Sequence, residues 1–491
     1  MPAEQKPNVL FIAIDDLNDW IGPLGGNSQA ITPNFDRLAK MGLTFTNAHT
    51  ASSACHPSRV ANMTGVRPAR TGIVRNDFKY RSEDEKPIWR DNAILKDAVT
   101  LSEYFRNKGY RSIGGGKIYH SLQWGEGTMT DKSAWDSYFP SFEKSIPTWP
   151  RPDMAIYKNA KWTKKRPLGN RYGLFGWEPL SVSDEETSDH KVVDWAIAEM
   201  NKKQEKPLFL ACGLFRPHIP WEVPQKYFDM YPLESVKLPM DDSEDLKDAW
   251  DHGRREWHQW VLDNKEWKRA VRGYLAAISY ADAQLGRLLD AYEKSGRSKD
   301  TILVLWSDHG MHIGEKQNWE KFTCWEESTR IPIFVVAPGV TTGGTVCDQP
   351  VTALDLYPTL VELSGNSINE NGLNKQLDGE SLLPLLKDVN AKRIQPAITS
   401  FGGAHTLRTK DWRYIVYPKE NLEELYDHRN DQGERLNLAY DPSYLEQLDA
   451  MRTEIKKWIN INIPEGKAQV PKGYQLVDGK TIAKMNFKVI K

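Results

Sequence analysis

The chain has 491 residues, of which 65 are lysine or arginine and 66 are aspartate or glutamate, so its formal charge is −1. This balance excludes a protein that coats nucleic acid or holds a membrane surface through its net charge. Hydrophobic residues make up 40% and charged residues 27%, a globular composition, and no apolar stretch approaches the roughly 18 residues of a membrane span.

Short apolar runs alternate with segments of helical periodicity along most of the chain. The run from 9 to 14 is unbroken and rich in β-branched residues, which predicts a strand buried on both faces. Thr32 predicts the N-terminal cap of a helix that Gly42 ends. A capping box at Thr100 and Glu103 opens the next predicted helix. The other predicted elements are helix 101–107, helix 184–200, strand 208–212, helix 270–294, strand 301–306 and strand 331–337.

Strands that alternate with helices of this length are typical of an α/β fold, with a large and mostly parallel sheet sandwiched by helices. After about residue 396 the pattern changes, because residues 411–417 alternate as a half-exposed strand does. We therefore expect a large N-terminal domain over residues 1–394 and a smaller C-terminal α+β subdomain over residues 395–491.

Two regions break the alternation, residues 127–181 and residues 239–267. We expect them to be insertions over one face of the sheet, where binding loops belong. The chain contains 18 Trp and 19 Tyr, and Trp rings stack on sugars as readily as they fill cores. For Trp250, Trp257, Trp260 and Trp267, packing is the favoured interpretation.

Polar side chains follow the predicted strands, at the sheet edge where open α/β folds bind ligands. Asp15 and Asp16 follow the first strand, and Asp308 and His309 follow the strand at 301–306. Adjacent carboxylates repel unless a cation neutralises them, and oxygen donors of this kind suit Ca²⁺ or Mg²⁺. The first pair alone would more often cap a turn, but the second pair favours a metal site. Other polar residues that follow predicted strands are Lys117, His120, Arg216 and His218.

The segment from Cys55 to Gly65 reads CHPSRVANMTG and carries the most specific motif of the chain. An isolated cysteine is most often a buried thiol. This segment instead resembles the signature of the type I sulfatases, in which Thr-Gly follows Cys-x-Pro-Ser-Arg, and Met63 stands where leucine is usual. The resemblance continues through landmarks in the same order, at residues 7–16, 116–117, 217–218, 307–315, 321, 355–359, 424–427 and 437–438.

The resemblance implies an alkaline-phosphatase-like fold and a hydrolase of sulfate esters. It also implies that a formylglycine-generating enzyme oxidises Cys55 to formylglycine (3-oxoalanine), whose hydrate attacks sulfur with the help of Ca²⁺. By position, the implied metal ligands are Asp15, Asp16, Cys55, Asp308 and His309. Lys117 and Lys321 correspond to residues that contact sulfate oxygens, and Arg59 corresponds to the residue that holds the hydrate.

Acid–base roles are assigned to two histidines through the same resemblance. His218 is predicted to protonate the leaving sugar oxygen, and His120 is predicted to help expel sulfate, although the two roles are interchangeable at this point. His405 lies in the glycine-containing segment 400–405 of the C-terminal part and is predicted to contact the sugar. His56 and His312 are expected to make only local contacts.

Within the family, residues 116–120, 216–220 and 308–309 look most like the iduronate-2-sulfatases and bacterial ulvan-type sulfatases. The expected substrate is therefore a sulfated uronic-acid-containing or algal oligosaccharide, such as one from ulvan. The family implies a periplasmic or secreted protein, although the first seven residues resemble no export signal. Two alternatives stay open: a formylglycine-dependent phosphodiesterase or phosphonate hydrolase, and a glycan-binding protein with an unmodified Cys55.

Overall fold

A single large sheet organises the fold. The computed structural model describes residues 6–76, 86–120, 130–139, 175–239, 245–250, 255–463, 466–470, 472 and 474–484. The strands of the sheet are β1 (Asn8–Ile14), β2 (Leu43–Phe45), β4 (Arg111–Gly116), β5 (Ser137–Phe139), β6 (Leu208–Leu214), β7 (Thr301–Ser307), β10 (Ile333–Val336) and β11 (Thr345–Cys347). Their order is β11-β2-β10-β7-β1-β6-β4-β5.

The sheet is mostly parallel, as predicted. Strand β1 runs parallel to both β6 and β7, and β4 runs parallel to β5 and β6. Only β10 opposes its neighbours β7 and β2. The register pairs Ile14 with Leu214 on one side and with Ser307 on the other, so the three central strands end at the same level. Residues that follow these strands are thereby brought to one edge.

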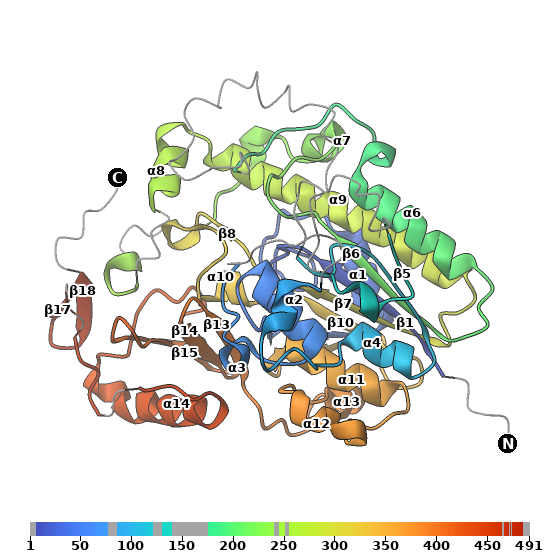
Figure 1. The fold of residues 1–491 in the computed structure, drawn as a ribbon. Helices are drawn as coiled ribbons and strands as arrows, with labels where there is room; N and C mark the ends of the chain where they lie inside the picture. The colour runs from blue at the N-terminus through green and yellow to red at the C-terminus, as the bar shows by residue number, and fades with distance from the viewer. Residues whose placement is uncertain are drawn as a thin grey trace.

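Helices cover both faces of the sheet (Figure 1). One face carries α1 (Pro33–Met41), α6 (Ser188–Asn201) and α9 (Trp267–Lys294), and the other carries α2 (Cys55–Thr64), α4 (Leu101–Asn107), α11 (Leu356–Leu363) and α13 (Leu383–Lys387). Alternate side chains of β1 enter the two cores, because successive residues of a strand point to opposite faces. Leu10, Ile12 and Ile14 join the α9 side, and Val9, Phe11 and Ala13 join the α4 side.

The predicted helix boundaries are largely confirmed, with two instructive differences. The capping box of Thr100 and Glu103 forms at α4 as predicted. Thr32 occupies the N-cap position of α1 as predicted, but its side chain makes no capping bond; its hydroxyl accepts from the Gly22 amide instead. The cap comes from Asp282 of α9, whose carboxylate accepts from the amides of Asn34 and Phe35. Helix α6 begins at Ser188 rather than at 184, because Thr187 caps it after a short 3₁₀ turn.

The C-terminal part forms a second, antiparallel sheet with a helix against it, as predicted. Its elements are β13 (Ala397–Phe401), β14 (Ala404–Arg408), β15 (Trp412–Tyr417), β16 (Leu422–Asp427) and α14 (Leu445–Trp458). The expectation of a half-exposed strand at 411–417 is wrong, because β15 is buried after its first residue. Arg413 donates to the Cys324 carbonyl of the main domain, and α14 contacts β16 through Arg452 and Glu423. The second sheet is therefore covered on both faces.

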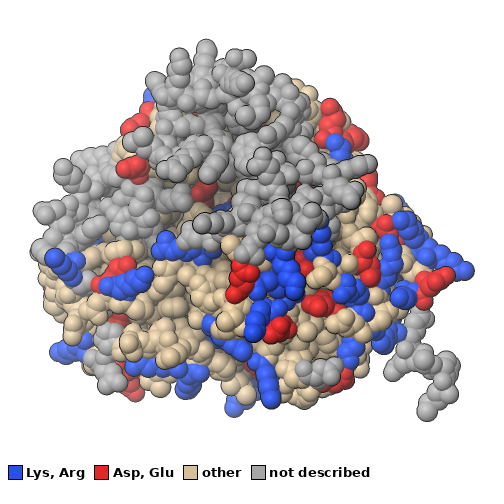
Figure 2. Space-filling view, in the orientation of Figure 1, with Lys and Arg blue, Asp and Glu red and all other residues tan. Residues whose placement is uncertain are grey.

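Four tryptophans of the two irregular regions, Trp177, Trp257, Trp260 and Trp267, pack into the core of the α9 face. Trp257 and Trp267 are buried together with Trp177, Trp221 and Trp319. This confirms the favoured interpretation for the first two; residues 140–174 of the first region lie outside the described residues. Lys and Arg are interspersed with Asp and Glu on the face in Figure 2, consistent with the net charge of −1.

Several short elements complete the described part of the chain. They are β3 (Ala48–His49), β8 (His312–Ile313), β9 (Trp319–Glu320), β12 (Val351–Thr352), β17 (Tyr474–Val477), β18 (Thr481–Lys484), α3 (Pro68–Thr71), α7 (Gln225–Asp229), α8 (Arg255–Asp263), α10 (Glu326–Thr329) and α12 (Leu373–Gln376). Among the helices of the described residues, none combines the length and apolarity that crossing a bilayer needs.

We predict that Asp282→Ala destabilises the protein by about 1–3 kcal/mol, because it leaves buried amides at the start of α1 without acceptors. Asp290→Ala is the matched control, since Asp290 also joins α9 to α1, through a half-exposed ion pair with Arg37. Removing that pair is expected to cost at most about 1 kcal/mol. Urea unfolding measures both; equal losses would contradict the role given to Asp282.

Candidate active site

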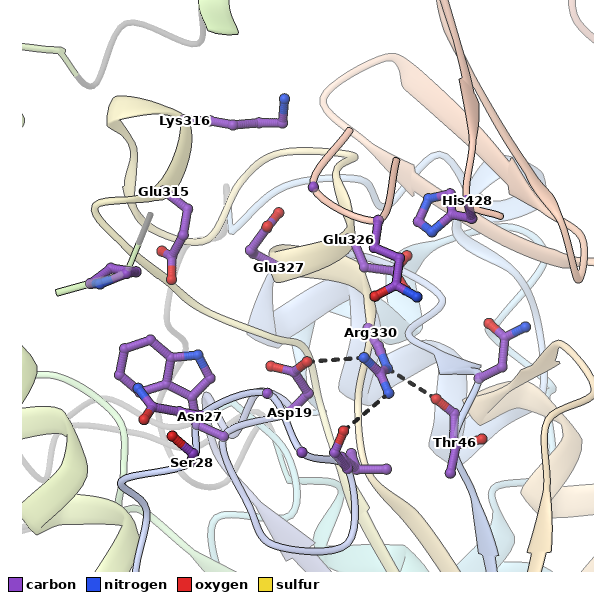
Figure 3. A pocket seen from close by; sticks show the side chains of 18 of the residues that line it. Asp19, Asn27, Ser28, Thr46, Glu315, Lys316, Glu326, Glu327, Arg330 and His428 are labelled. Atoms are coloured by element: carbon purple, nitrogen blue, oxygen red, sulfur yellow. Dashed lines mark hydrogen bonds and ion pairs between the residues drawn. The ribbon is translucent and has the colours of Figure 1, made fainter. Parts of the chain in front are cut away.

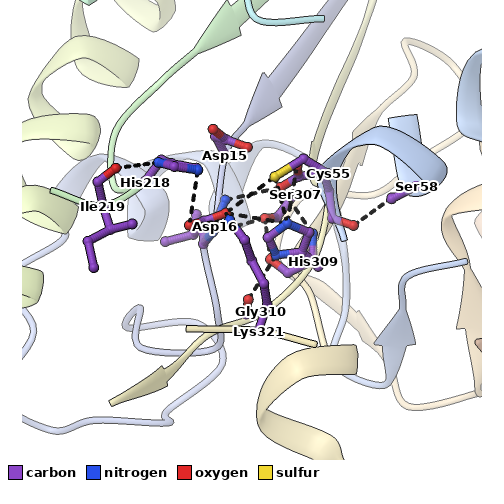
Figure 4. Close-up of polar contacts among 12 residues, drawn as sticks. Asp15, Asp16, Cys55, Ser58, His218, Ile219, Ser307, His309, Gly310 and Lys321 are labelled. Atoms are coloured by element: carbon purple, nitrogen blue, oxygen red, sulfur yellow. Dashed lines mark hydrogen bonds and ion pairs between the residues drawn. The ribbon is translucent and has the colours of Figure 1, made fainter. Parts of the chain in front are cut away.

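Five side chains with metal-binding donor atoms meet at the carboxyl edge of the sheet. Asp15 and Asp16 follow β1, Asp308 and His309 follow β7, and Cys55 is the first residue of α2. All five residues are fully buried, and one donor atom of each lies within 4.8 Å of the donors of the others. Figure 4 shows Asp16, Cys55 and His309 converging there. The structure thus brings together all five predicted ligands.

Arg59, one turn along α2 from Cys55, binds two of these aspartates. Its Nη2 lies 2.8 Å from Asp15 Oδ1, and its Nε lies 2.9 Å from Asp308 Oδ2. Its Nη1 donates to the carbonyls of Lys117 and Ile118, which follow β4. Arg59 was predicted to hold the hydrated nucleophile; in this structure its donors contact the ends of three strands. The predicted contact with the nucleophile stays a prediction.

Asp16 is held by charged partners from other elements. The Lys321 ammonium lies 2.6 and 2.9 Å from its two carboxylate oxygens, and His309 Nε2 lies 3.3 Å from Oδ1. His218 Nε2 lies 3.8 Å from Oδ2. The Asp16 backbone has φ of 59°, a strained region for an aspartate, and its amide donates to Asp308 Oδ1. The Asp16 backbone thereby joins the end of β1 to the residue that follows β7.

The Cys55 thiol occupies the centre of the group. Its Sγ lies 3.2 Å from His309 Nε2 and 3.9 Å from Asp16 Oδ1. Burial alone would raise the pKa of Cys55, but the ammonium groups of Lys321 and Lys117 hold it below its usual value. The position at the start of α2 also favours negative charge, since the helix amides point there. Any derivative of this side chain would face the predicted ligands and both lysines.

Lys117 and His120 reach the same region from the end of β4. The Lys117 ammonium forms an ion pair with Asp15 and lies 4.7 Å from the centroid of the Phe215 ring. Burial raises the pKa of Asp15, but Lys117 and Arg59 outweigh it and keep the pKa well below its usual range. The His120 ring centroid lies 6.4 Å from that of His56, and burial, reinforced by Lys117, lowers the pKa of His120 well below its usual value.

His218 approaches from the loop after β6. Burial, reinforced by Lys321 and Lys117, holds the pKa of His218 well below its usual value, so the ring is neutral near pH 7 before substrate binds. A bound sulfate ester adds negative charge beside the two lysines and favours the protonated ring. Arg216 of the same loop instead donates to the Glu222 carbonyl, while the Asp189 carboxylate accepts from the Phe215 and Arg216 amides.

His405 is placed differently from the other predicted residues. It lies on β14, is 8% exposed, and its Nδ1 is 2.9 Å from the Ser400 hydroxyl. The adjacent Thr399 donates to the Thr50 carbonyl, in the loop before Cys55. Because neighbouring residues of a strand face opposite ways, Ser400 and His405 occupy the sheet face turned away from that loop. A sugar contact by His405 stays a prediction.

Sequence reasoning missed two hydroxyls that fix the site. Thr50 and Ser58 both donate to the Asp308 carbonyl. Thr50 lies outside the recognisable motif, and a single threonine in a loop carries no pattern. Ser58 belongs to the motif, so its position in CHPSR was the available signal.

A large cavity lies elsewhere. Its volume is about 870 Å³, and none of the five predicted metal ligands lines it. It is lined by Asp19, Glu326, Glu327 and Arg330 of the main domain and by the loop around His428 (Figure 3). Arg330 binds Asp19 at 3.0 Å, and opposite charges alternate along the wall. The reacting groups are instead packed against one another at the sheet edge.

The donor set at the sheet edge fits a hard divalent cation. Ligands that share one Ca²⁺ at about 2.3–2.6 Å cannot lie more than about 5 Å apart, and these donors satisfy that limit. Three carboxylates provide the oxygen atoms that such ions prefer. A second group, Glu326, His428 and Glu434, also satisfies the distance limit, but there Arg413 pairs with both glutamates. That group is an ion-pair network.

Family models match most of the chain. A model described as "Sulfatase" matches residues 7–366, and one described as "N-sulphoglucosamine sulphohydrolase, C-terminal" matches residues 314–460. A protein of Formosa agariphila named sulfatase is 38% identical over 92% of this chain and 87% of its own length. Human iduronate 2-sulfatase is 29% identical over 79% of this chain and 70% of its own.

Other relatives match in sequence, and solved structures match in fold, over most of the chain. An ulvan-active sulfatase of Formosa agariphila is 25% identical over 94% of this chain and 81% of its own, and a choline-sulfatase of Rhizobium meliloti is 27% identical over 89% and 83%. A phosphonate monoester hydrolase from Silicibacter pomeroyi superposes with a TM-score of 0.69 at 19% identity, covering 98% of this chain and all of that one. A structure bound to D-glucosamine-2-N,6-O-disulfate superposes with a TM-score of 0.68 at 18% identity, covering 92% and 97%.

The solved structures confirm the expected fold, and the family models identify the chain independently of it. Together with the CHPSR motif at the centre of the site, they lead to one conclusion. The chain belongs to the sulfatase family and is a sulfuric ester hydrolase.

Proposed function

We propose that the protein removes sulfate from a uronic-acid-containing or algal carbohydrate, such as an ulvan oligosaccharide, after a formylglycine-generating enzyme has oxidised Cys55. The observation that carries the proposal is the position of Cys55 among the four other donors and beside the buried Lys117 and Lys321. The names of the iduronate 2-sulfatase and ulvan-active sulfatase relatives support the substrate class. The predicted periplasmic or secreted location stays a prediction.

The proposed metal is Ca²⁺, held by Asp15, Asp16, Asp308, His309 and the modified residue 55. When bound, it would add positive charge where the sulfate ester must lie and would make a hydroxyl of residue 55 easier to deprotonate. Formylglycine itself would supply that hydroxyl, as the hydrate of its aldehyde, for attack on sulfur. The charges present favour this arrangement, because three buried cations, Arg59, Lys117 and Lys321, balance the three aspartates.

The other side chains bind the ester and move protons. Lys117 and Lys321 are buried cations beside Cys55 and would each donate to a sulfate oxygen. His218 would protonate the leaving sugar oxygen, and His120 would take a proton from residue 55 when sulfate departs. The imidazoles start neutral, so His218 must gain its proton once the anionic ester is bound.

The first test measures anion release by protein produced together with a formylglycine-generating enzyme. The substrates are ulvan oligosaccharides, a 2-O-sulfated hexuronate disaccharide, choline sulfate and a phosphonate monoester. We expect sulfate from one of the two glycans, and none from Cys55→Ala. Peptide mass at residue 55 reports the oxidation directly. Release of phosphonate alone would contradict the proposal and favour a phosphonate hydrolase, and an unmodified Cys55 would favour a glycan-binding protein.

The metal assignment predicts that Ca²⁺ stabilises the protein. At about 100 times its Kd, a ligand that binds only the folded state adds about 2.7 kcal/mol, so Tm should rise with Ca²⁺ and fall with EDTA. Asp16→Asn should remove this dependence. Asp19→Asn is the matched control, because Asp19 pairs with Arg330 outside the donor group. An equal Ca²⁺ response in wild type and Asp16→Asn would rule out the site.

The proton donor can be identified from the leaving group. A sugar alkoxide needs protonation as it departs, whereas 4-nitrophenolate does not. We therefore predict that His218→Ala lowers kcat for a sugar sulfate by roughly 10²–10⁴-fold and affects 4-nitrophenyl sulfate much less. His120 is proposed to act after the leaving group has gone, so His120→Ala should lower kcat for both substrates alike. The opposite pattern would exchange the two roles.

A further inference from the structure

A solvent-exposed arginine stands beside the loop that leads to the active site. Arg75 follows α3, and its Nη2 donates to the Gly402 carbonyl at 3.1 Å. Its guanidinium carbon lies 6.0 Å from the centroid of the Phe401 ring. Within the ranges that the structure describes, these are its polar and ring contacts, and neither supplies a negative charge. The guanidinium therefore keeps most of its five donors for another group.

Two hydrogen bonds hold the residues on either side of Arg75. The side-chain carbonyl of Asn76 accepts from the His56 amide at 3.0 Å. On the other side of Arg75, the Val74 carbonyl accepts from the Gly402 amide at 3.0 Å. Arg75 is thus held between the start of α2 and the turn that joins β13 to β14.

Aromatic contacts tie the same arginine to the residue after Lys321. The Phe401 ring, next to Arg75, lies 5.5 Å from the ring of Phe322. The Phe322 amide donates to the Ser53 carbonyl at 3.1 Å, two residues before Cys55. Arg75, Phe401 and Phe322 therefore form a continuous ledge, which we call the rim ledge. It is anchored beside the nucleophile at one end and beside Lys321 at the other.

The turn at Gly402 is shaped to admit the arginine. Gly402 has φ of 62°, and a Cβ atom there would lie 3.2 Å from Arg75 Nη2. Any larger residue would therefore crowd the guanidinium as well as strain the backbone.

We propose that Arg75 binds the carboxylate of a uronic acid in the sulfated substrate. The inference rests on the proposed carbohydrate sulfatase activity and names the residue that distinguishes the substrate. Lys117 and Lys321 neutralise the sulfate deep in the site, so a further cation on the rim ledge suits a second anionic group on the same molecule. A guanidinium pairs with a carboxylate through two parallel hydrogen bonds, and the Phe401 ring borders the Arg75 guanidinium on one side.

The test compares two substrates that differ by one charge. A 2-O-sulfated hexuronate disaccharide and its carboxyl methyl ester carry the same sulfate and the same sugars. Wild type is expected to prefer the free acid, and Arg75→Gln is expected to lower the ratio of the two kcat/KM values about tenfold. Arg75→Lys, which keeps the charge but not the fork, should lie between the two.

Arg297→Gln is the matched control. Arg297 also donates to a single backbone carbonyl, that of Lys202, but it lies beyond α9, before the start of β7. This variant should keep the wild-type ratio. If Arg75→Gln lowered both kcat/KM values equally, its role would be structural and the proposal would be wrong; an unchanged pair of values would overturn it as well.

A failure of the proposed activity is recognised separately. If wild type hydrolysed neither disaccharide, the proposed function would fall, while calorimetric binding of acid and ester to the Cys55→Ala protein would still measure the preference. If the double variant Cys55→Ala with Arg75→Gln binds the acid about tenfold more weakly than Cys55→Ala alone, the result supports the proposal. Equal affinity of Cys55→Ala for acid and ester overturns it.

Discussion

The active site depends on one buried arginine that neutralises two buried aspartates. Arg59 binds Asp15 at the end of β1 and Asp308 at the end of β7, and it also binds the carbonyls that follow β4. All three side chains are fully buried, so removing the arginine would break two buried ion pairs, at a cost of about 3–5 kcal/mol, and would leave Asp15 with Lys117 as its cation. Because Arg59 and Cys55 share the first turns of α2, this ion pair also fixes the depth at which residue 55 enters the site.

The charge balance explains why so polar a centre is stable at the heart of the sheet edge. With all six groups ionised, the three aspartates and Arg59, Lys117 and Lys321 sum to zero, although burial raises the pKa of Asp16 to about 8 against the opposing effect of Lys321. A divalent cation would make the centre positive, and the negative charge of a sulfate ester would reduce that excess. The positive charge that the cation adds would therefore lower the energy of burying the sulfate ester, which is consistent with a site that favours small anions.

The sequence predicted local secondary structure better than contacts between residues that are far apart in the chain. Strand β1 and the capping box of α4 depend on neighbouring residues, and both were predictable because such local patterns determine them. The cap of α1 was not, because Asp282 lies some 250 positions away and only the packing of α9 brings it there. The buried face of β15 was missed for the same reason: its alternation is real, but α14 and the main domain cover both sides. Asp15, Asp16, Asp308 and His309 were predictable because parallel strands end at one edge, whereas Cys55 and Arg59 were predictable only from the family motif.

The division between reaction and recognition follows from the same architecture. The groups that would act on sulfur come from the ends of β1, β4, β6 and β7 and from α2, and ion pairs lock most of them together. The rim ledge draws instead on the β13–β14 turn of the second sheet, which reaches the loop before Cys55 through the amide of Ser400 and the hydroxyl of Thr399. A substitution in that turn can alter which sugar is accepted without disturbing the buried charges. On the proposed role of Arg75, substrate preference would depend on the rim ledge, to which the C-terminal sheet contributes Phe401 and Gly402, while the chemistry would depend on the edge of the parallel sheet.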